Sequence, residues 1–121
     1  MSSILIVEDD RSTCLFLSET LKAAGFTVAS AKNGADALKC LGAGSYDLML
    51  LDVWMPEMNG LEVQARLRRI SPATRVVMLT AKDDPSVRRI AMNAGASAFF
   101  TKGVESDDFL AGVKAAADSG S

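Results

Sequence analysis

The 121-residue sequence contains no histidine, only two cysteines and three prolines, and a single tryptophan. Without histidine it has no Ser–His catalytic pair, no histidine-ligated zinc and no phosphohistidine of its own. Its chemistry must therefore depend on carboxylates, hydroxyls, lysine or a bound ion. Cys14 and Cys40 match no metal-ligand spacing and fall at expected apolar helix positions, so we interpret them as buried thiols in a reducing compartment.

Long apolar runs and an excess of basic charge are also missing. The apolar runs are far too short to span a bilayer, and the N-terminus lacks the pattern of a secretory signal. The formal net charge of -2 favours neither nucleic acid nor an anionic membrane as the main partner. We therefore expect a cytoplasmic protein without direct nucleic-acid or membrane partners. The composition, 49% hydrophobic and 23% charged, predicts one domain over residues 1–121, with 119–121 as a flexible tail.

Five short apolar segments alternate with patterns typical of helices. They cover residues 4–7, 26–30, 48–51, 76–79 and 98–100, and the stretches between them carry apolar residues at helical spacing. Continuous apolar strands linked by helices predict an α/β doubly wound fold, with a parallel five-stranded sheet covered on both faces. We expect Asp10 or Ser12 to cap the first helix, Gly25 to end it, and Gly42 and Gly44 to end the second.

Four of these segments stop at polar residues suited to phosphate or metal chemistry. The stopping points are Glu8-Asp9-Asp10, Asp52, Thr80 and, one threonine beyond the fifth segment, Lys102. Ligands of an open parallel sheet bind at the carboxyl ends of its strands. We therefore expect three of these acids, a hydroxyl and an ammonium to meet at one edge of the sheet.

Asp52 is the residue that we expect to react. A carboxylate can attack phosphorus to give an acyl phosphate, but the approach of two anions needs neutralising charge. A divalent cation held by Glu8, Asp9 and Asp52 supplies that charge; oxygen ligands favour Mg²⁺, with Mn²⁺ as a substitute. Lys102 then pairs with one phosphoryl oxygen, and the Thr80 hydroxyl donates to another.

Each of these residues also has an ordinary structural explanation. An aspartate after a strand often only caps a helix, which is the favoured interpretation of Asp10. A threonine can do the same, and a single lysine is usually on the surface. Because the remaining residues occupy corresponding positions at separate strand ends, we favour one joint site.

The same residues resemble the motifs of a response-regulator receiver domain of two-component signalling, a CheY-like domain, over essentially the whole chain. The motifs are Glu8-Asp9-Asp10, the run from Asp52 through Met55-Pro56 to Gly60, Thr80-Ala81 and Lys102. The resemblance implies a flavodoxin-like (βα)5 fold with strand order 2-1-3-4-5. It further implies a phosphorelay in which Asp52 accepts a phosphoryl group from a histidine kinase or histidine phosphotransfer protein.

The resemblance also implies a role for each site residue. The Mg²⁺ ligands are Glu8, Asp9, Asp52 and the backbone carbonyl of Trp54. When Thr80 moves inward it vacates volume that the Phe99 ring fills, which reshapes the face of the fourth helix, fifth strand and fifth helix. That face then controls a downstream target protein or output domain. Such a domain is a regulatory phosphoacceptor, and not an enzyme, although it assists its own phosphorylation and autodephosphorylation.

Three positions depart from the family pattern. Gly103 replaces the proline that usually follows the lysine in a cis bond; because a cis bond without proline costs about 2.5–4 kcal/mol, we expect a trans Lys102–Gly103 peptide. Trp54 is large for its place two residues after Asp52, and we expect it to shield the acyl phosphate from water. Phe99 lacks a phenolic hydroxyl, so a readout through it depends on packing. Arg88, on the fourth helix, is interpreted as solvated surface.

Three other functions compete with this interpretation. A flavodoxin-type electron carrier needs a phosphate-binding loop where this chain has Glu8, Asp9 and Asp10. A Mg²⁺-dependent phosphohydrolase normally needs a second acid at the position of Trp54, and a cap domain. A degenerate receiver acts only as a protein-interaction module. It would not need the complete set of site residues, which is Glu8, Asp9, Asp52, Thr80 and Lys102.

Overall fold

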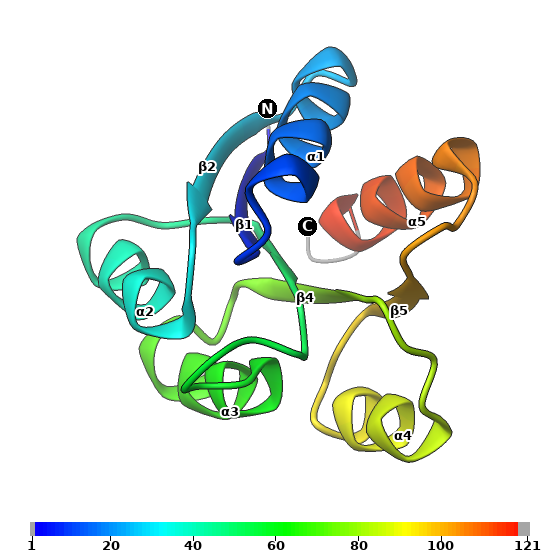
Figure 1. The fold of residues 1–121 in the computed structure, drawn as a ribbon. Helices are drawn as coiled ribbons and strands as arrows, with labels where there is room; N and C mark the ends of the chain where they lie inside the picture. Colours follow the sequence, from blue (N-terminus) through cyan, green and yellow to red (C-terminus); the bar gives the residue numbers. More distant parts are fainter. Residues whose placement is uncertain (1, 119–121) are drawn as a thin grey trace.

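The computed structural model describes residues 2–118 and contains, within them, five strands alternating with five helices (Figure 1). In chain order they are β1 (Ser3–Val7), α1 (Arg11–Ala23), β2 (Thr27–Ala31), α2 (Gly34–Ala43), β3 (Leu48–Leu51), α3 (Gly60–Ile70), β4 (Arg75–Thr80), α4 (Pro85–Asn93), β5 (Ala98–Thr101) and α5 (Ser106–Asp118). All paired strands are parallel, in the order β2-β1-β3-β4-β5. The predicted fold class and strand order are therefore confirmed. The expected tail, 119–121, lies outside the described residues.

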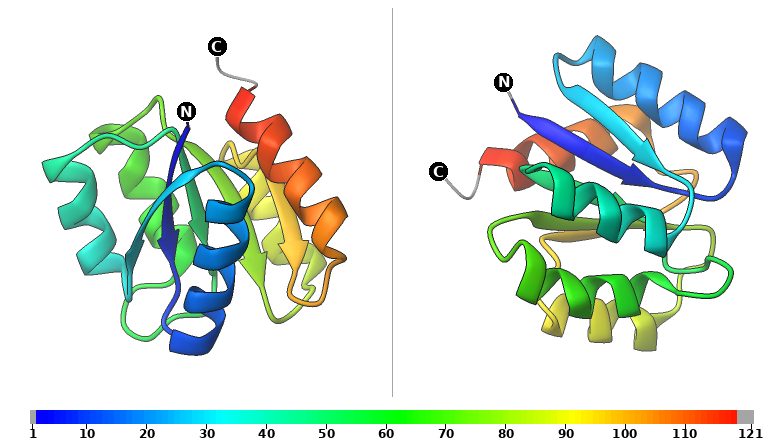
Figure 2. Two further views of the ribbon diagram at one scale, coloured as in Figure 1. Left: turned by 90° about the horizontal axis from the view of Figure 1, so that it is seen from above. Right: turned by 90° about the vertical axis from the view of Figure 1, so that its left-hand side faces the viewer.

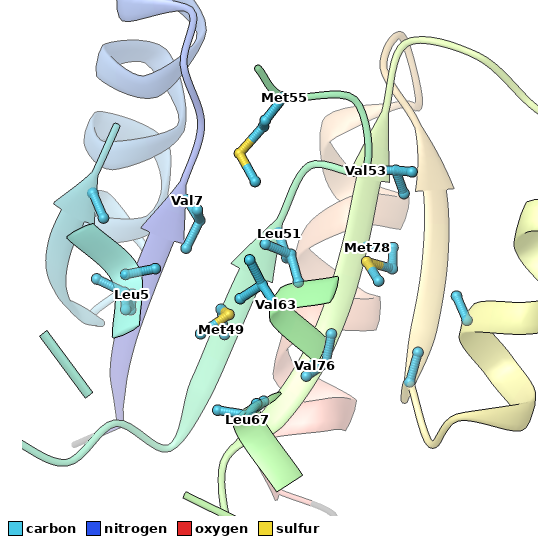
Figure 3. Close-up of a cluster of buried hydrophobic side chains, with 14 of the residues drawn as sticks. Leu5, Val7, Met49, Leu51, Val53, Met55, Val63, Leu67, Val76 and Met78 are labelled. Carbon is cyan, nitrogen blue, oxygen red and sulfur yellow. The ribbon is translucent and has the colours of Figure 1, made fainter. Parts of the chain in front are cut away.

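The helices cover both faces of the sheet (Figure 1). On one face, Leu21 of α1 and Val113 of α5 belong to the same buried cluster. On the other face, α2, α3 and α4 pack over a second cluster, which includes Val63 and Leu67 of α3 (Figure 3). Among the helices of residues 2–118, none combines the length and apolar character that a bilayer crossing requires.

The central strands are buried on both sides, which explains their unbroken apolar sequence. In β1, Ile4 and Ile6 belong to the cluster under α1 and α5, whereas Leu5 and Val7 belong to the opposite one. All four side chains are at most 1% exposed. Because fully burying one aliphatic side chain contributes about 1.5–3 kcal/mol, these residues hold the strand firmly in place.

Local signals set most helix boundaries. Asp10, and not Ser12, caps α1, and Gly25 follows its end with a φ of +100°. Gly42 was expected to end α2, but the helix runs through it to Ala43, and Gly44 is the C-cap. The expectation failed because an exposed glycine close to a helix end is compatible with helical geometry, at a cost of only about 1 kcal/mol relative to alanine.

The strands all point toward one edge of the sheet, where their arrowheads gather in the left view of Figure 2. The loops from β1 to α1, from β3 to α3 and from β4 to α4 leave from this edge. Parallel pairing therefore places the polar residues that follow separate strands side by side, as expected from the sequence.

Gly60, the first residue of α3, determines how closely that helix approaches the end of β3. Its amide donates to the Val53 carbonyl at 2.9 Å. A Cβ at this position would lie 2.3 Å from the Asp52 carbonyl oxygen and 2.9 Å from the Val53 Cα. Both neighbours are backbone atoms, so they cannot move aside without displacing Asp52 itself.

We therefore predict that Gly60→Ala destabilises the protein by about 2 kcal/mol or more, the cost of overpacking a close contact. Gly42→Ala is the matched control, because a Cβ at Gly42 meets no atom within 4 Å. This control should leave stability unchanged or raise it. Urea denaturation of both variants checks the prediction, and equal stabilities would contradict it.

Candidate functional site

The carboxyl ends of β1 and β3 bring three acidic side chains together. The two strands pair with Val7 opposite Leu51, and the residues that follow are Glu8 and Asp52. One carboxylate oxygen from each of Glu8, Asp9 and Asp52 lies within 4.8 Å of the other two. Glu8 is 3% exposed and Asp52 is 5% exposed, whereas Asp9 is open to solvent. The structure thus assembles the acidic cluster that the sequence predicts.

Lys102 lies between two of these acids. Its Nζ is 2.9 Å from Glu8 Oε1 and 3.4 Å from Asp52 Oδ2. Its backbone amide donates to the Thr80 carbonyl at 2.7 Å, which continues the β4–β5 ladder past the strand end. Because β4 separates β5 from β3, the long lysine side chain has to cross the end of β4 to reach the acids.

The charges of the cluster shift one another's protonation. Burial raises the pKa of Glu8 from 4.5 to about 7; the hydrogen bond from Lys102 lowers it, and the negative charge of Asp52 raises it. For Lys102, partial burial works against the ammonium, but the hydrogen bond to Glu8 and the charge of Asp52 outweigh it and raise the pKa. The lysine therefore remains charged but does not fully compensate the two buried carboxylates.

Asp10 does not join this cluster. Its carboxylate accepts hydrogen bonds from the Thr13 hydroxyl and, at 3.1 Å, from the Thr13 amide. Both hydrogen bonds lower the pKa of Asp10, and the bond from the hydroxyl has the larger effect. These contacts confirm the interpretation of Asp10 as the cap of α1. A carboxylate bound to its own helix has less capacity for another ligand.

Thr80 is the last residue of β4 and is completely buried. Its hydroxyl has no hydrogen-bond partner among the described residues. A buried hydroxyl without a partner costs about 1–3 kcal/mol, and most such groups in native proteins are paired. Thr80 therefore carries an unused donor at the edge of the sheet where the acids gather.

Trp54 and Gly103 closely follow two of the site residues in sequence, Asp52 and Lys102. The Trp54 amide donates to Asp52 Oδ1 at 3.2 Å, and the residue is 47% exposed. The Lys102–Gly103 peptide is trans, as predicted, and Gly103 adopts a φ of +102°. A positive φ suits glycine, so this loop needs no proline to bring Lys102 to the acids.

Phe99 and Arg88 form a contact that the sequence interpretation missed. Phe99 is only 6% exposed, and the Arg88 guanidinium lies over its ring, with Cζ 4.7 Å from the centroid. Arg88 was interpreted as solvated surface, and its side chain is indeed 44% exposed, but its guanidinium also covers the ring. No sequence pattern indicates this pairing, since it joins α4 to β5 through tertiary packing.

Comparison with known families agrees with this geometry. The family model described as "Response regulator receiver domain" matches residues 4–114. A curated relative, the uncharacterized transcriptional regulatory protein YkoG of Bacillus subtilis, is 38% identical over 93% of this chain and 50% of that protein. The CpxR homolog of Haemophilus influenzae is 38% identical over 95% of this chain and 50% of its own length. The chain thus spans about half the length of these relatives.

Solved structures show the same fold. A CheY-like receiver domain protein from Methanospirillum hungatei superposes with a TM-score of 0.92 at 27% identity, covering 98% of this chain and 95% of that one. The response regulator TrrA of Thermotoga maritima, in complex with Mg²⁺ and BeF, gives a TM-score of 0.85 at 32% identity, covering 94% and 97%. The chain belongs to the response-regulator receiver-domain family of two-component signalling.

Proposed function

We propose that Asp52 accepts a phosphoryl group from a phosphohistidine of a histidine kinase or histidine phosphotransfer protein. One oxygen of the Asp52 carboxylate forms the new bond to phosphorus, the bond from phosphorus to the imidazole nitrogen breaks, and that nitrogen keeps the electron pair. The observation that carries this proposal is the 3.4 Å contact between Lys102 Nζ and Asp52 Oδ2 beside the acidic cluster. It puts a cation within reach of the entering phosphoryl group.

The cluster fits a divalent cation. Three carboxylates within 4.8 Å of one another, with only one ammonium beside them, leave excess negative charge in a largely buried place. We propose that Glu8, Asp9, Asp52 and the Trp54 carbonyl hold Mg²⁺, or Mn²⁺ in its place. When bound, the ion neutralises charge on the phosphoryl oxygens. The related TrrA structure was solved with Mg²⁺ and BeF.

Thr80 and Lys102 complete the site on the other side of Asp52. In the proposal, Lys102 binds one phosphoryl oxygen as a point charge, and the Thr80 hydroxyl turns to donate to another. The turn gives that buried hydroxyl its missing partner. Movement of Thr80 then affects Phe99 on the neighbouring strand and the surface formed by α4, β5 and α5.

The proposed output is a change in that surface. Curated relatives named as transcriptional regulators are about twice as long as this chain, so a linked output domain or a separate target protein is the proposed recipient. Nothing in the charge of the described surface favours direct nucleic-acid binding by this domain, and we propose a cytoplasmic location. The competing function, a degenerate receiver used only for protein interaction, does not account for two buried acids joined by a lysine.

The proposal predicts that acetyl phosphate and Mg²⁺ add one phosphoryl group to the wild-type protein and none to Asp52→Ala. Intact-mass spectrometry is the measurement. Asp47→Ala is the matched control, because Asp47 precedes β3 and lies at its opposite end. A phosphorylated Asp52→Ala variant, or an unmodified wild-type protein, would refute the proposal.

The raised pKa of Glu8 predicts that the stability of the metal-free protein depends on pH. The folded state retains the Glu8 proton up to a pKa of about 7, whereas the unfolded chain releases it near 4.5. Stability from this group is therefore complete below about pH 4.5 and is lost as the pH rises to about 7. We predict a fall in Tm across this window that Glu8→Gln largely removes, and a larger stabilisation by Mg²⁺ at pH 7.5 than at pH 5. Parallel Tm profiles for wild type and variant would contradict this.

The position of Trp54 predicts slow hydrolysis of the phosphoryl group on Asp52. Its amide is tied to Asp52, so the residue lies directly beside the reactive carboxylate. We predict that Trp54→Asn shortens the lifetime of the phosphorylated protein several-fold, because a small polar side chain admits water. Trp54→Phe, which keeps an aromatic ring, should retain most of the lifetime. Decay of the phosphorylated species on a phosphate-affinity gel measures both, and an unchanged lifetime in Trp54→Asn would overturn the idea.

A further inference from the structure

The Arg88 side chain joins three parts of the structure. Nη1 donates to the Phe99 carbonyl on β5 at 3.4 Å, and Nη2 is 3.2 Å from Asp83 Oδ1 in the loop between β4 and α4. The guanidinium also covers the Phe99 ring, 4.7 Å from its centroid. A planar guanidinium can make all three contacts at once, because its donors form a fork and its face stacks on aromatic rings.

Two of these contacts are connected to Thr80. Asp83 lies three residues after Thr80, in the short loop between β4 and α4. Phe99 lies on β5 next to β4, with Met78 opposite it in the register. In the proposed rearrangement, movement of Thr80 toward Asp52 reaches the Asp83–Arg88 ion pair through this short segment.

The other end of α4 is attached separately. The Gln64 side-chain amide of α3 donates to the Ala91 carbonyl at 3.0 Å, in a buried position. Only Val87 and Ala91 of α4 are buried, so few side chains hold this short helix on the sheet. Its N-terminal half carries the Arg88 contacts and the buried Val87, whereas its C-terminal half is hydrogen-bonded to α3.

We propose that Arg88 is a positioning residue that stabilises the arrangement in which the Thr80 hydroxyl is unpartnered and Phe99 is covered, against the arrangement in which Thr80 contacts a phosphoryl group on Asp52. This rests on the proposed function. A contact that stabilises one of two arrangements weakens binding of any ligand that requires the other. Removing the guanidinium should thus strengthen binding of a phosphoryl analogue.

The test is calorimetric titration of the whole chain with beryllofluoride at saturating Mg²⁺. Arg88→Met keeps an unbranched apolar chain over Phe99 and loses the charge, and we expect it to bind about two- to fivefold more tightly than wild type, the scale of one exposed cation–π contact. Arg88→Lys keeps the cation but loses the fork of donors, so its affinity should lie between that of wild type and that of Arg88→Met. Arg89→Met, an exposed neighbour with the same charge change, is the matched control and should not bind more tightly.

Asp83→Asn adds a second check through the ion pair. If Asp83 and Arg88 act together, their effects on beryllofluoride affinity will not add in the double variant. The inference would be overturned if Arg88→Met bound beryllofluoride no more tightly than Arg89→Met, whatever the Tm of either variant. The proposed function would remain intact in that case. A wild-type protein that binds no beryllofluoride would overturn the proposed function, and this inference with it.

Discussion

The ammonium of Lys102 lies between two buried carboxylates, and the remainder of the site depends on this contact. Two unpaired acids at the end of a dry sheet would be costly, because burial disfavours their charged forms. Lys102 compensates them only in part, as the pKa of Glu8 near 7 indicates. One ammonium is thus too little positive charge for the carboxyl groups at the place where the proposed cation and phosphoryl group enter.

Rigid and movable parts of the site come from different elements. Glu8 and Asp52 extend strands whose apolar residues are buried on both faces, and the first residue of α3 touches the Asp52 backbone directly. These acids cannot shift without disturbing the core. Thr80, by contrast, is followed by an exposed loop and a short helix with few buried side chains. The fold therefore fixes Asp52, the proposed phosphoacceptor, and leaves more freedom at Thr80 and α4, where the proposed change would be transmitted.

The Thr80 hydroxyl and the Phe99 ring refine the family picture of switching. The ring is already buried under Arg88, so there is little exposed aromatic surface left for it to lose. The hydroxyl, by contrast, still lacks a hydrogen-bond partner, at a cost of about 1–3 kcal/mol. In the proposed mechanism, pairing that hydroxyl with a phosphoryl oxygen favours the phosphorylated arrangement, and the contacts of Arg88 with Phe99 and Asp83 oppose it.

Sequence by itself determined the five-stranded fold, because strand periodicity and parallel pairing leave few ways to arrange such segments. The same pairing placed the polar residues after the strands at one edge of the sheet. The strand order came from the family resemblance. Sequence alone misjudged Gly42, since one exposed glycine does not stop a helix. Only the tertiary structure decided that the Thr80 hydroxyl lacks a partner and that Arg88 covers Phe99. Such contacts depend on side-chain distances between elements, which no local pattern of residues encodes.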